Sequence, residues 1–295
     1  RKPVLIASLL IMGLATFAIG ILPTYATVGV AAPILLVVTR IIQGLAFGAE
    51  WGGAILMTYE HAPWRRKGAF GALPQAGFPL GLLLANLAFF ASSGLPDDWK
   101  WRTPFLLSAL LVFAGLYIRL KVEESPEFEE IKEEGKIEKN PLLSVLRSDW
   151  QNLLRAFCMR IAETAGYAIA ITYMSSYLKS NQLADPSQTI LAIVIAALVG
   201  FPATLFWGWL TDRIGRKPVY VFGTTMILLS GIPLFLIANT GVFPLIVAVF
   251  VFSFAICQNS LAGTQASWFP ELFNTGTRSS GASLAYQLSA VVSGF

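Results

Sequence analysis

Ionisable side chains interrupt the apolar stretches of this sequence at four positions, Arg40, Glu50, Arg160 and Glu163. Arg160, Glu163 and Tyr167 are spaced i, i+3 and i+7, which places a cation, an acid and a hydroxyl on one face of a helix. The cation can attract an anion, and an acid withdrawn from water can exchange a proton near neutral pH. This face is therefore a candidate proton and anion site. A structural ion pair between Arg160 and Glu163, with Arg160 reaching toward the wet helix end, is the alternative.

A second stripe lies in an earlier apolar stretch, where Arg40, Gln43, Phe47 and Glu50 recur at spacings of three and four. Such spacings put all four side chains on one face of a helix. Arg40 and Glu50 would be about 15 Å apart along the helix axis, so they cannot pair and each needs another partner or water. We expect Glu50, Glu163 and Arg40 to serve proton coupling.

Further polar side chains inside apolar stretches could line a cavity. We expect substrate contacts from five residues, namely Arg160, Tyr167, Gln75, Gln258 and Gln265. Hydrogen bonding between helices is at least as good an explanation for the uncharged ones, because polar side chains in lipid find partners on neighbouring helices.

Motifs for cofactor or metal chemistry are absent from the sequence. No glycine-rich loop ends in Gly-Lys-Ser or Gly-Lys-Thr, which argues against ATP as the energy source. His61 has no metal-ligand spacing around it, and Cys158 and Cys257 lie within apolar stretches. We therefore expect no cofactor, no metal and no enzymatic activity.

A short basic turn, Thr211 to Pro218, separates two long apolar stretches. Glycine permits a positive φ at position 215, and proline suits the first turn of the helix that follows. Asp212 at the helix end can accept hydrogen bonds from the N-terminus of a neighbouring helix, or pair with Arg213 or Arg216. The sequence predicts a stiff turn that can hold two helices together.

The composition indicates a polytopic membrane protein, since 55% of the residues are hydrophobic and only 13% are charged. A spanning helix needs about 20 mostly apolar residues. The continuous runs favour an all-α bundle over a barrel. We expect spans at Pro3–Leu22, Pro33–Met57, Ala69–Ala91, Thr103–Arg119, Asn152–Leu178, Ser187–Trp209, Pro218–Ala238 and Phe243–Thr264, and a ninth that begins near Gly281.

Basic residues gather on alternate connections, which orients the chain in a cell membrane with these connections inside. The cytoplasmic set comprises Arg1, Lys2, Arg65, Arg66, Lys67, Arg119, Lys121, Lys132, Lys136, Lys139, Arg147, Arg213, Arg216, Lys217 and Arg278. The basic residues behind the net charge of +4 are thus distributed over several cytoplasmic connections. They form no single basic face that could bind nucleic acid. We expect a multi-pass, monomeric protein of the inner or plasma membrane.

The tetrapeptide Arg-Lys-Pro-Val begins at residue 1 and again at residue 216. With the same offset, Gln43 corresponds to Gln258 and Gly48 to Gly263. Internal repeats of this kind are a recurring feature of secondary transporters, and turns on the same side of the membrane make them parallel repeats.

Two of these motifs resemble those of the major facilitator superfamily: Asp212 to Lys217 is similar to its loop motif, and Arg40 to Gly44 to its fourth-helix motif. The segments similar to its metabolite:proton symporters, which carry shikimate, α-ketoglutarate, citrate, or proline and betaine, are Gly48–Gly53, Glu60–Pro63, Trp101–Phe105, Glu124–Phe128, Pro270–Phe273 and Thr277–Gly281.

This resemblance implies a bundle of two parallel six-helix repeats, of which the sequence covers about helices 3 to 11. Residues 1–120 would form the first half (helices 3 to 6), 121–150 a cytoplasmic linker and 151–295 an incomplete second half (helices 7 to 11). It also implies a gating role for Asp212, Arg213, Gly215, Arg216 and Lys217.

The function expected from the residues and the resemblance is proton-coupled symport of a small polar metabolite across the lipid bilayer, such as shikimate or a dicarboxylate, by alternating access. An uncoupled sugar-type facilitator of the same fold is one alternative. A membrane receptor or sensor that does not transport is another.

Overall fold

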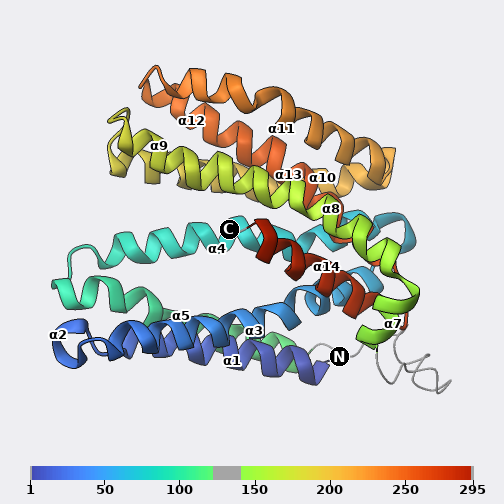
Figure 1. Ribbon diagram of the computed structural model, residues 1–295, viewed down its shortest axis with the longest axis horizontal. Coiled ribbons are helices and arrows are strands. Elements are labelled where there is room, and N and C mark those ends of the chain that lie inside the picture. Colours follow the sequence, from blue (N-terminus) through green and yellow to red (C-terminus); the bar gives the residue numbers. More distant parts are fainter. Residues whose placement is uncertain (1, 122–140, 294–295) are drawn as a thin grey trace. The chain divides into compact units, whose positions relative to one another are not determined.

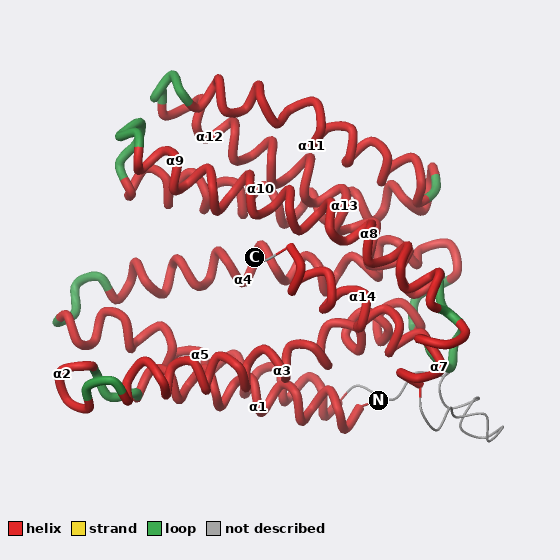
Figure 2. Tube along the Cα trace, viewed as in Figure 1, coloured by secondary structure: helices red, strands yellow, loops and turns green. Residues whose placement is uncertain are grey.

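Helices account for every regular element in the residues that the computed structural model describes, 2–121 and 141–293. Figure 2 shows these helices joined by short turns. Residue 1, the Glu124–Phe128 segment and most of the expected linker, residues 122–140, lie outside the described ranges.

The described helices follow one another with few interruptions. They are α1 (Lys2–Ile21), α2 (Tyr25–Val28), α3 (Ala31–Glu60), the 3-10 turn η1 (Trp64–Arg66), α4 (Lys67–Ser92), α5 (Asp97–Lys121), α7 (Pro141–Ser148), α8 (Trp150–Tyr167), the π-helical turn η2 (Ala168–Tyr173), α9 (Met174–Ser180), α10 (Pro186–Ile214), α11 (Arg216–Ala238), α12 (Phe243–Val251), the π-helical turn η3 (Phe252–Gln258), α13 (Asn259–Glu271) and α14 (Arg278–Ser293).

Seven helical stretches of the described residues are long and apolar enough to cross a membrane. They are Lys2–Ile21, Ala31–Glu60, Trp64–Ser92, Asp97–Lys121, Pro186–Ile214, Arg216–Ala238 and Phe243–Glu271. The prediction of an all-α, multi-pass membrane protein is confirmed. The expected span Asn152–Leu178 is helical throughout but is not among these seven: η2 divides it, and its first part carries Arg155, Arg160 and Glu163.

The chain forms two compact units. The first comprises 1–54 and 84–125. In it α1 lies along α5 (Figure 1), and Gly13 and Gly20 allow the backbone of α1 to approach Val112 and Leu106 of α5. Arg102 on α5 donates to the Gly20 carbonyl at 3.0 Å, which fixes the register of this pair.

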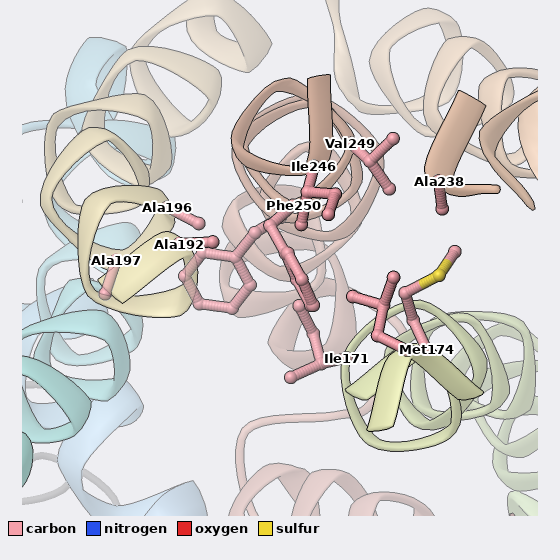
Figure 3. Close-up of a cluster of buried hydrophobic side chains, with 11 residues drawn as sticks. Ile171, Met174, Ala192, Ala196, Ala197, Ala238, Ile246, Val249 and Phe250 are labelled. Atoms are coloured by element: carbon pink, nitrogen blue, oxygen red, sulfur yellow. The ribbon is translucent and has the colours of Figure 1, made fainter. Parts of the chain in front are cut away.

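The second unit comprises 55–83 and 126–295 and contains the larger core. In Figure 3, Phe250, Ile246 and Val249 of α12 meet small and apolar side chains from α10 and from the helix that runs through η2. Alanines on α10, Ala192 and Ala196 among them, leave the room that the Phe250 ring fills. The expected division into halves at residues 121–150 stays a prediction.

Two π-helical turns interrupt the helices of this second unit. η2 and η3 contact each other, and η3 ends at Gln258. An extra residue in a helical turn rotates the side chains that follow it, and such turns occur frequently at functional sites. The sequence analysis did not predict either of them.

Candidate functional site

A group of buried polar side chains, here called the buried polar cluster, lies where α8, α11, η3, α13 and α14 meet in the second unit. Its members are Arg160, Glu163, Tyr220, Gln258, Gln265 and Tyr286. Four of them were expected site residues, and the structure brings these four together.

Arg160 and Glu163 form an ion pair one helical turn apart on α8. Glu163 also accepts a hydrogen bond from the side-chain amide of Gln258. Arg160 donates to Oε1 of Gln265 at 3.5 Å, and its guanidinium lies 3.8 Å from the centre of the Tyr286 ring. Arg160 thus contacts residues of two further helices, α13 and α14, and Glu163 contacts one residue of η3.

The cluster is closed to its surroundings. Arg160 is 8% exposed, Glu163 3% and Gln265 0%, so Arg160 does not reach toward a wet helix end. Removing a charged side chain from water is expensive, and buried charges in membrane proteins usually mark a substrate or proton path. The ion pair between Arg160 and Glu163, which the sequence analysis gave as the alternative to a binding site, is present, but it is buried and not at a wet helix end.

Two further contacts complete the network. Gln265 donates its amide to Oη of Tyr220 at 3.2 Å, and Tyr220 donates to the carbonyl of Met159. Tyr220 and Tyr286 were missed by the sequence analysis, because each lies on a different helix and nothing in its spacing points to α8.

Three polar atoms of the cluster have no hydrogen-bond partner among the described residues, and one of them, Oε2 of Glu163, faces Arg160 in the ion pair. The other two, Oε1 of Gln258 and Nε of Arg160, are buried and have no partner among the described residues. An apolar cavity of about 100 Å³ adjoins Gln258 and is also lined by Cys257 and Ser230. An acceptor and a donor therefore remain available to a ligand, since a buried polar group without a partner is costly.

Tyr167 and Gln75 lie outside this network. The ring of Tyr167 packs edge-on against Phe78 at 5.6 Å and near Phe254. Gln75 is buried on α4 and donates to the carbonyl of Ala262 at 3.4 Å. Their expected substrate contacts stay predictions.

Glu50 and Arg40 belong to the first unit. Glu50 pairs with Arg119 of α5 at 2.5 Å, and both side chains are largely covered. Arg40 is exposed and donates to Gln43 at 3.4 Å. Glu50 and Arg40 thus have different partners, as expected for two residues too far apart along the helix to pair. The sequence analysis did not name Arg119 as a partner.

A second group, here called the charged turn cluster, surrounds the turn between α10 and α11. It consists of Asp212, Arg216 and Glu271 with Tyr59 and the first backbone N–H groups of α4. Gly215 has φ of +93°, and Pro218 lies in the first turn of α11, as the sequence predicts.

Asp212 joins two elements in this cluster. Its carboxylate accepts the backbone N–H of Gly68 at 2.7 Å and of Ala69 at 2.9 Å, at the start of α4. Helix N-termini carry unpaired N–H groups and a partial positive charge, so a carboxylate stabilises them. Arg216 holds the other side of Asp212 at 2.9 Å.

Arg216 also reaches a second acid. Its Nη2 lies 3.0 Å from Oε1 of Glu271 at the end of α13, and Tyr59 donates to the same oxygen at 3.4 Å. Arg213 and Lys217 are exposed; Arg213 lies over the Trp209 ring at 5.3 Å. The structure therefore brings together Asp212, Gly215 and Arg216 but not the other two expected gating residues.

The sequence is similar to known membrane proteins over its whole length. It matches the Major Facilitator Superfamily over residues 1–295. It is 36% identical over 301 residues to the inner membrane metabolite transport protein YhjE of Escherichia coli K12, covering 99% of this chain and 68% of that protein.

Two further relatives bear more specific names. The shikimate transporter of Escherichia coli K12 is 36% identical over 304 residues, covering 100% of this chain and 69% of that protein. The proline/betaine transporter of the same strain is 33% identical over 313 residues, covering 100% and 61%. A crystal structure of a double-tryptophan XylE mutant superposes with a TM-score of 0.73 at 17% identity, covering 98% of this chain and 70% of that one.

Proposed function

The chain belongs to the Major Facilitator Superfamily, and on that premise we propose that it carries a small organic acid together with protons. The family and its named relatives are transporters and not enzymes. From that membership it follows that the protein spans the membrane several times and has a small-molecule substrate. The proton and the acid are the new elements of the proposal.

The ion pair between Arg160 and Glu163 inside the buried polar cluster is the observation that carries it. A guanidinium offers planar, two-pronged recognition of a carboxylate. Gln258 and Gln265, on the same helical stretch seven residues apart, supply an acceptor and donors for hydroxyl or carboxyl groups of a ligand. These groups suit shikimate or a dicarboxylate.

Competition for Arg160 would couple the substrate to a proton. In the empty site Glu163 neutralises Arg160. When a substrate carboxylate pairs with Arg160, Glu163 loses its cation inside a closed site and takes up a proton, because a buried carboxylate without a partner is unfavourable. A monocarboxylate and one proton then enter together, and the net charge of the cluster does not change; a dicarboxylate needs a second proton for the same balance.

The charged turn cluster would act as the gate. Asp212 and Arg216 tie α4 to the α10–α11 turn and to the end of α13. In alternating access by two rocking halves, residues 1–120 and 151–295, these contacts form in one state and break in the other.

Uptake by the full-length protein in proteoliposomes tests this function. Radiolabelled shikimate and α-ketoglutarate are offered with an inward proton gradient, and again after an ionophore has collapsed it. Accumulation that requires the gradient is the expected result. Uptake that the ionophore leaves unchanged would contradict coupling and identify an uncoupled facilitator, and ligand binding without uptake would identify a receptor.

A further inference from the structure

A cavity of about 1120 Å³, here called the basic cavity, lies over the charged turn cluster in the second unit. Its cations are Arg65, Arg66, Lys67, Arg213 and Arg216, and its acids are Asp212 and Glu271. Its wall includes the proposed gate, but the cavity lies apart from the buried polar cluster and has no role in the substrate binding proposed above.

The cavity has unneutralised positive charge. Both of its acids already bind Arg216, and Asp212 also caps α4. Arg65 and Arg66 are exposed and make no ion pair with any described residue. Arg213 is exposed as well, so the cavity keeps positive charge from Arg65, Arg66 and Arg213 and attracts an anion.

The cavity also lies at the ends of membrane spans. α3 ends at Glu60, α4 begins at Lys67 and α10 ends at Ile214. Two tryptophans line it, Trp64 with 83% of its surface exposed and Trp209 with 44%. Tryptophan is enriched where the hydrocarbon meets the headgroups, and the basic residues identify this end as cytoplasmic.

Apolar surface continues from the cavity along two of these helices. Leu73 lies three residues beyond Phe70 on α4, and Phe206 lies three before Trp209 on α10, so each shares a helix face with a lining residue. Both side chains are about half exposed. Charge at the membrane surface that leads onto apolar helix faces fits a lipid better than a soluble anion.

We propose that the basic cavity binds the phosphate headgroup of an anionic phospholipid of the cytoplasmic leaflet. Arg65, Arg66 and Arg213 donate to the phosphate oxygens, and the acyl chains lie along α4 and α10. Because η1, which directly precedes α4, and the α10–α11 turn both contribute cations, the lipid bridges the same junction that Asp212 bridges. Basic pockets at this depth are known binding places for anionic headgroups in other membrane proteins.

Native mass spectrometry of the full-length protein, titrated with dioleoylphosphatidylglycerol or dioleoylphosphatidylcholine, tests the proposal. One basic residue near an anionic surface contributes about 1 kcal/mol, or roughly fivefold in affinity. The variant R65Q/R66Q should therefore bind phosphatidylglycerol about 25-fold more weakly than the wild type. Binding of phosphatidylcholine should be equal in both.

A matched variant, R147Q/R155Q, removes two exposed cations of the same unit that do not line the cavity. It should bind phosphatidylglycerol like the wild type. Unchanged binding by R65Q/R66Q, or an equal loss in both variants, would overturn the proposal. Thermal unfolding in phosphatidylcholine checks the fold, and R213Q, with an expected loss of about fivefold, is a second variant.

The anion could also come from solution. Inorganic phosphate is therefore added to the protein that carries phosphatidylglycerol. Retention of the lipid at millimolar phosphate supports the assignment. Displacement by phosphate in the wild type, together with phosphate binding that R65Q/R66Q loses, would show that the cavity takes a soluble anion instead.

Discussion

The carboxylate of Asp212 accepts the backbone N–H of Gly68 at 2.7 Å, although 144 residues separate the two in the sequence. The contact is possible because position 68 has no side chain: a Cβ there would overlap Thr211 and the carbonyl of Gly208, and would lie 2.8 Å from Oδ1 of Asp212. The start of α4 and the end of α10 therefore meet backbone to backbone.

Replacing Gly68 by alanine should separate these helices. Overpacking a tight contact costs about 1–3 kcal/mol, and here the same change displaces the two N–H groups that Asp212 binds. We expect G68A to lower the thermal stability of the full-length protein in detergent and to impair uptake.

Alanine at Gly77 of the same helix is the matched control, because a Cβ there meets nothing within 4 Å. It should unfold at the wild-type temperature or slightly above, since alanine favours a helix over glycine. Equal effects of the two substitutions would show that helix propensity matters and the close approach does not.

Asp212→Asn should weaken the cap of α4 without adding bulk. Asparagine has one acceptor oxygen where Asp212 uses two, and it carries no charge for Arg216 or for the helix N-terminus. Charged hydrogen bonds contribute about 1.5–3 kcal/mol. Hydrogen exchange at the amides of Gly68 and Ala69 should accelerate about tenfold or more.

Asp185→Asn provides the comparison for that experiment. Asp185 caps α10 through a capping box with Gln188, so its replacement removes a cap elsewhere. Faster exchange at Gly68 in D185N, or unchanged exchange in D212N, would argue against the role given to Asp212.

Much of this turn could be predicted from the sequence, because its geometry depends on local residues. The positive φ of Gly215 and the place of Pro218 follow from residue type alone. The partners of Asp212 do not: the sequence offers Arg213 and Arg216 equally, and only the path of α11 selects Arg216. Glu271 lies in the Pro270–Phe273 segment that carries the resemblance, but nothing in its position points to Arg216.

Arg160→Lys should keep the charge of the buried polar cluster and lose its recognition. Lysine lacks the planar fork that contacts Glu163, Gln265 and the Tyr286 ring together. We expect the dissociation constant of a bound carboxylate to rise about tenfold or more, as measured by equilibrium binding, because a charged hydrogen bond contributes about 1.5–3 kcal/mol.

Arg155→Lys on the same helix is the control for this substitution. Arg155 is exposed and bonds only Asn152 among the described residues. It should bind the carboxylate like the wild type. Wild-type affinity in R160K would mean that the pair with Glu163 is structural.

Arg119→Gln should destabilise the first unit more than the double variant R119Q/E50Q. The single change leaves the Glu50 carboxylate largely covered without its cation, whereas the double change removes both charges. We expect a difference of about 1–3 kcal/mol in unfolding free energy, the range for an unsatisfied buried group. Equal stabilities would show that solvent screens the pair.

The positions of Arg160 and Glu163 on one helix face could be predicted from their spacing, whereas the approach of Gln258 and Gln265 could not. Gln258 ends a π-helical turn, and periodicity based on 3.6 residues assigns the side chains after such a turn to the wrong face. The pairing of Glu50 with Arg119 was missed for another reason. Arg119 lies at the end of a span, where the sequence alone favours an exposed loop cation.

Proton-driven uptake by Glu163→Gln in proteoliposomes tests the central proposal most directly. Glutamine keeps the shape and the contact with Gln258 but cannot take up a proton, so we expect E163Q to lose accumulation driven by a pH gradient while it still exchanges labelled for unlabelled substrate. Glu50→Gln, assayed beside it, tests the other acid. Full gradient-driven uptake by E163Q would contradict the account, whatever the result for E50Q.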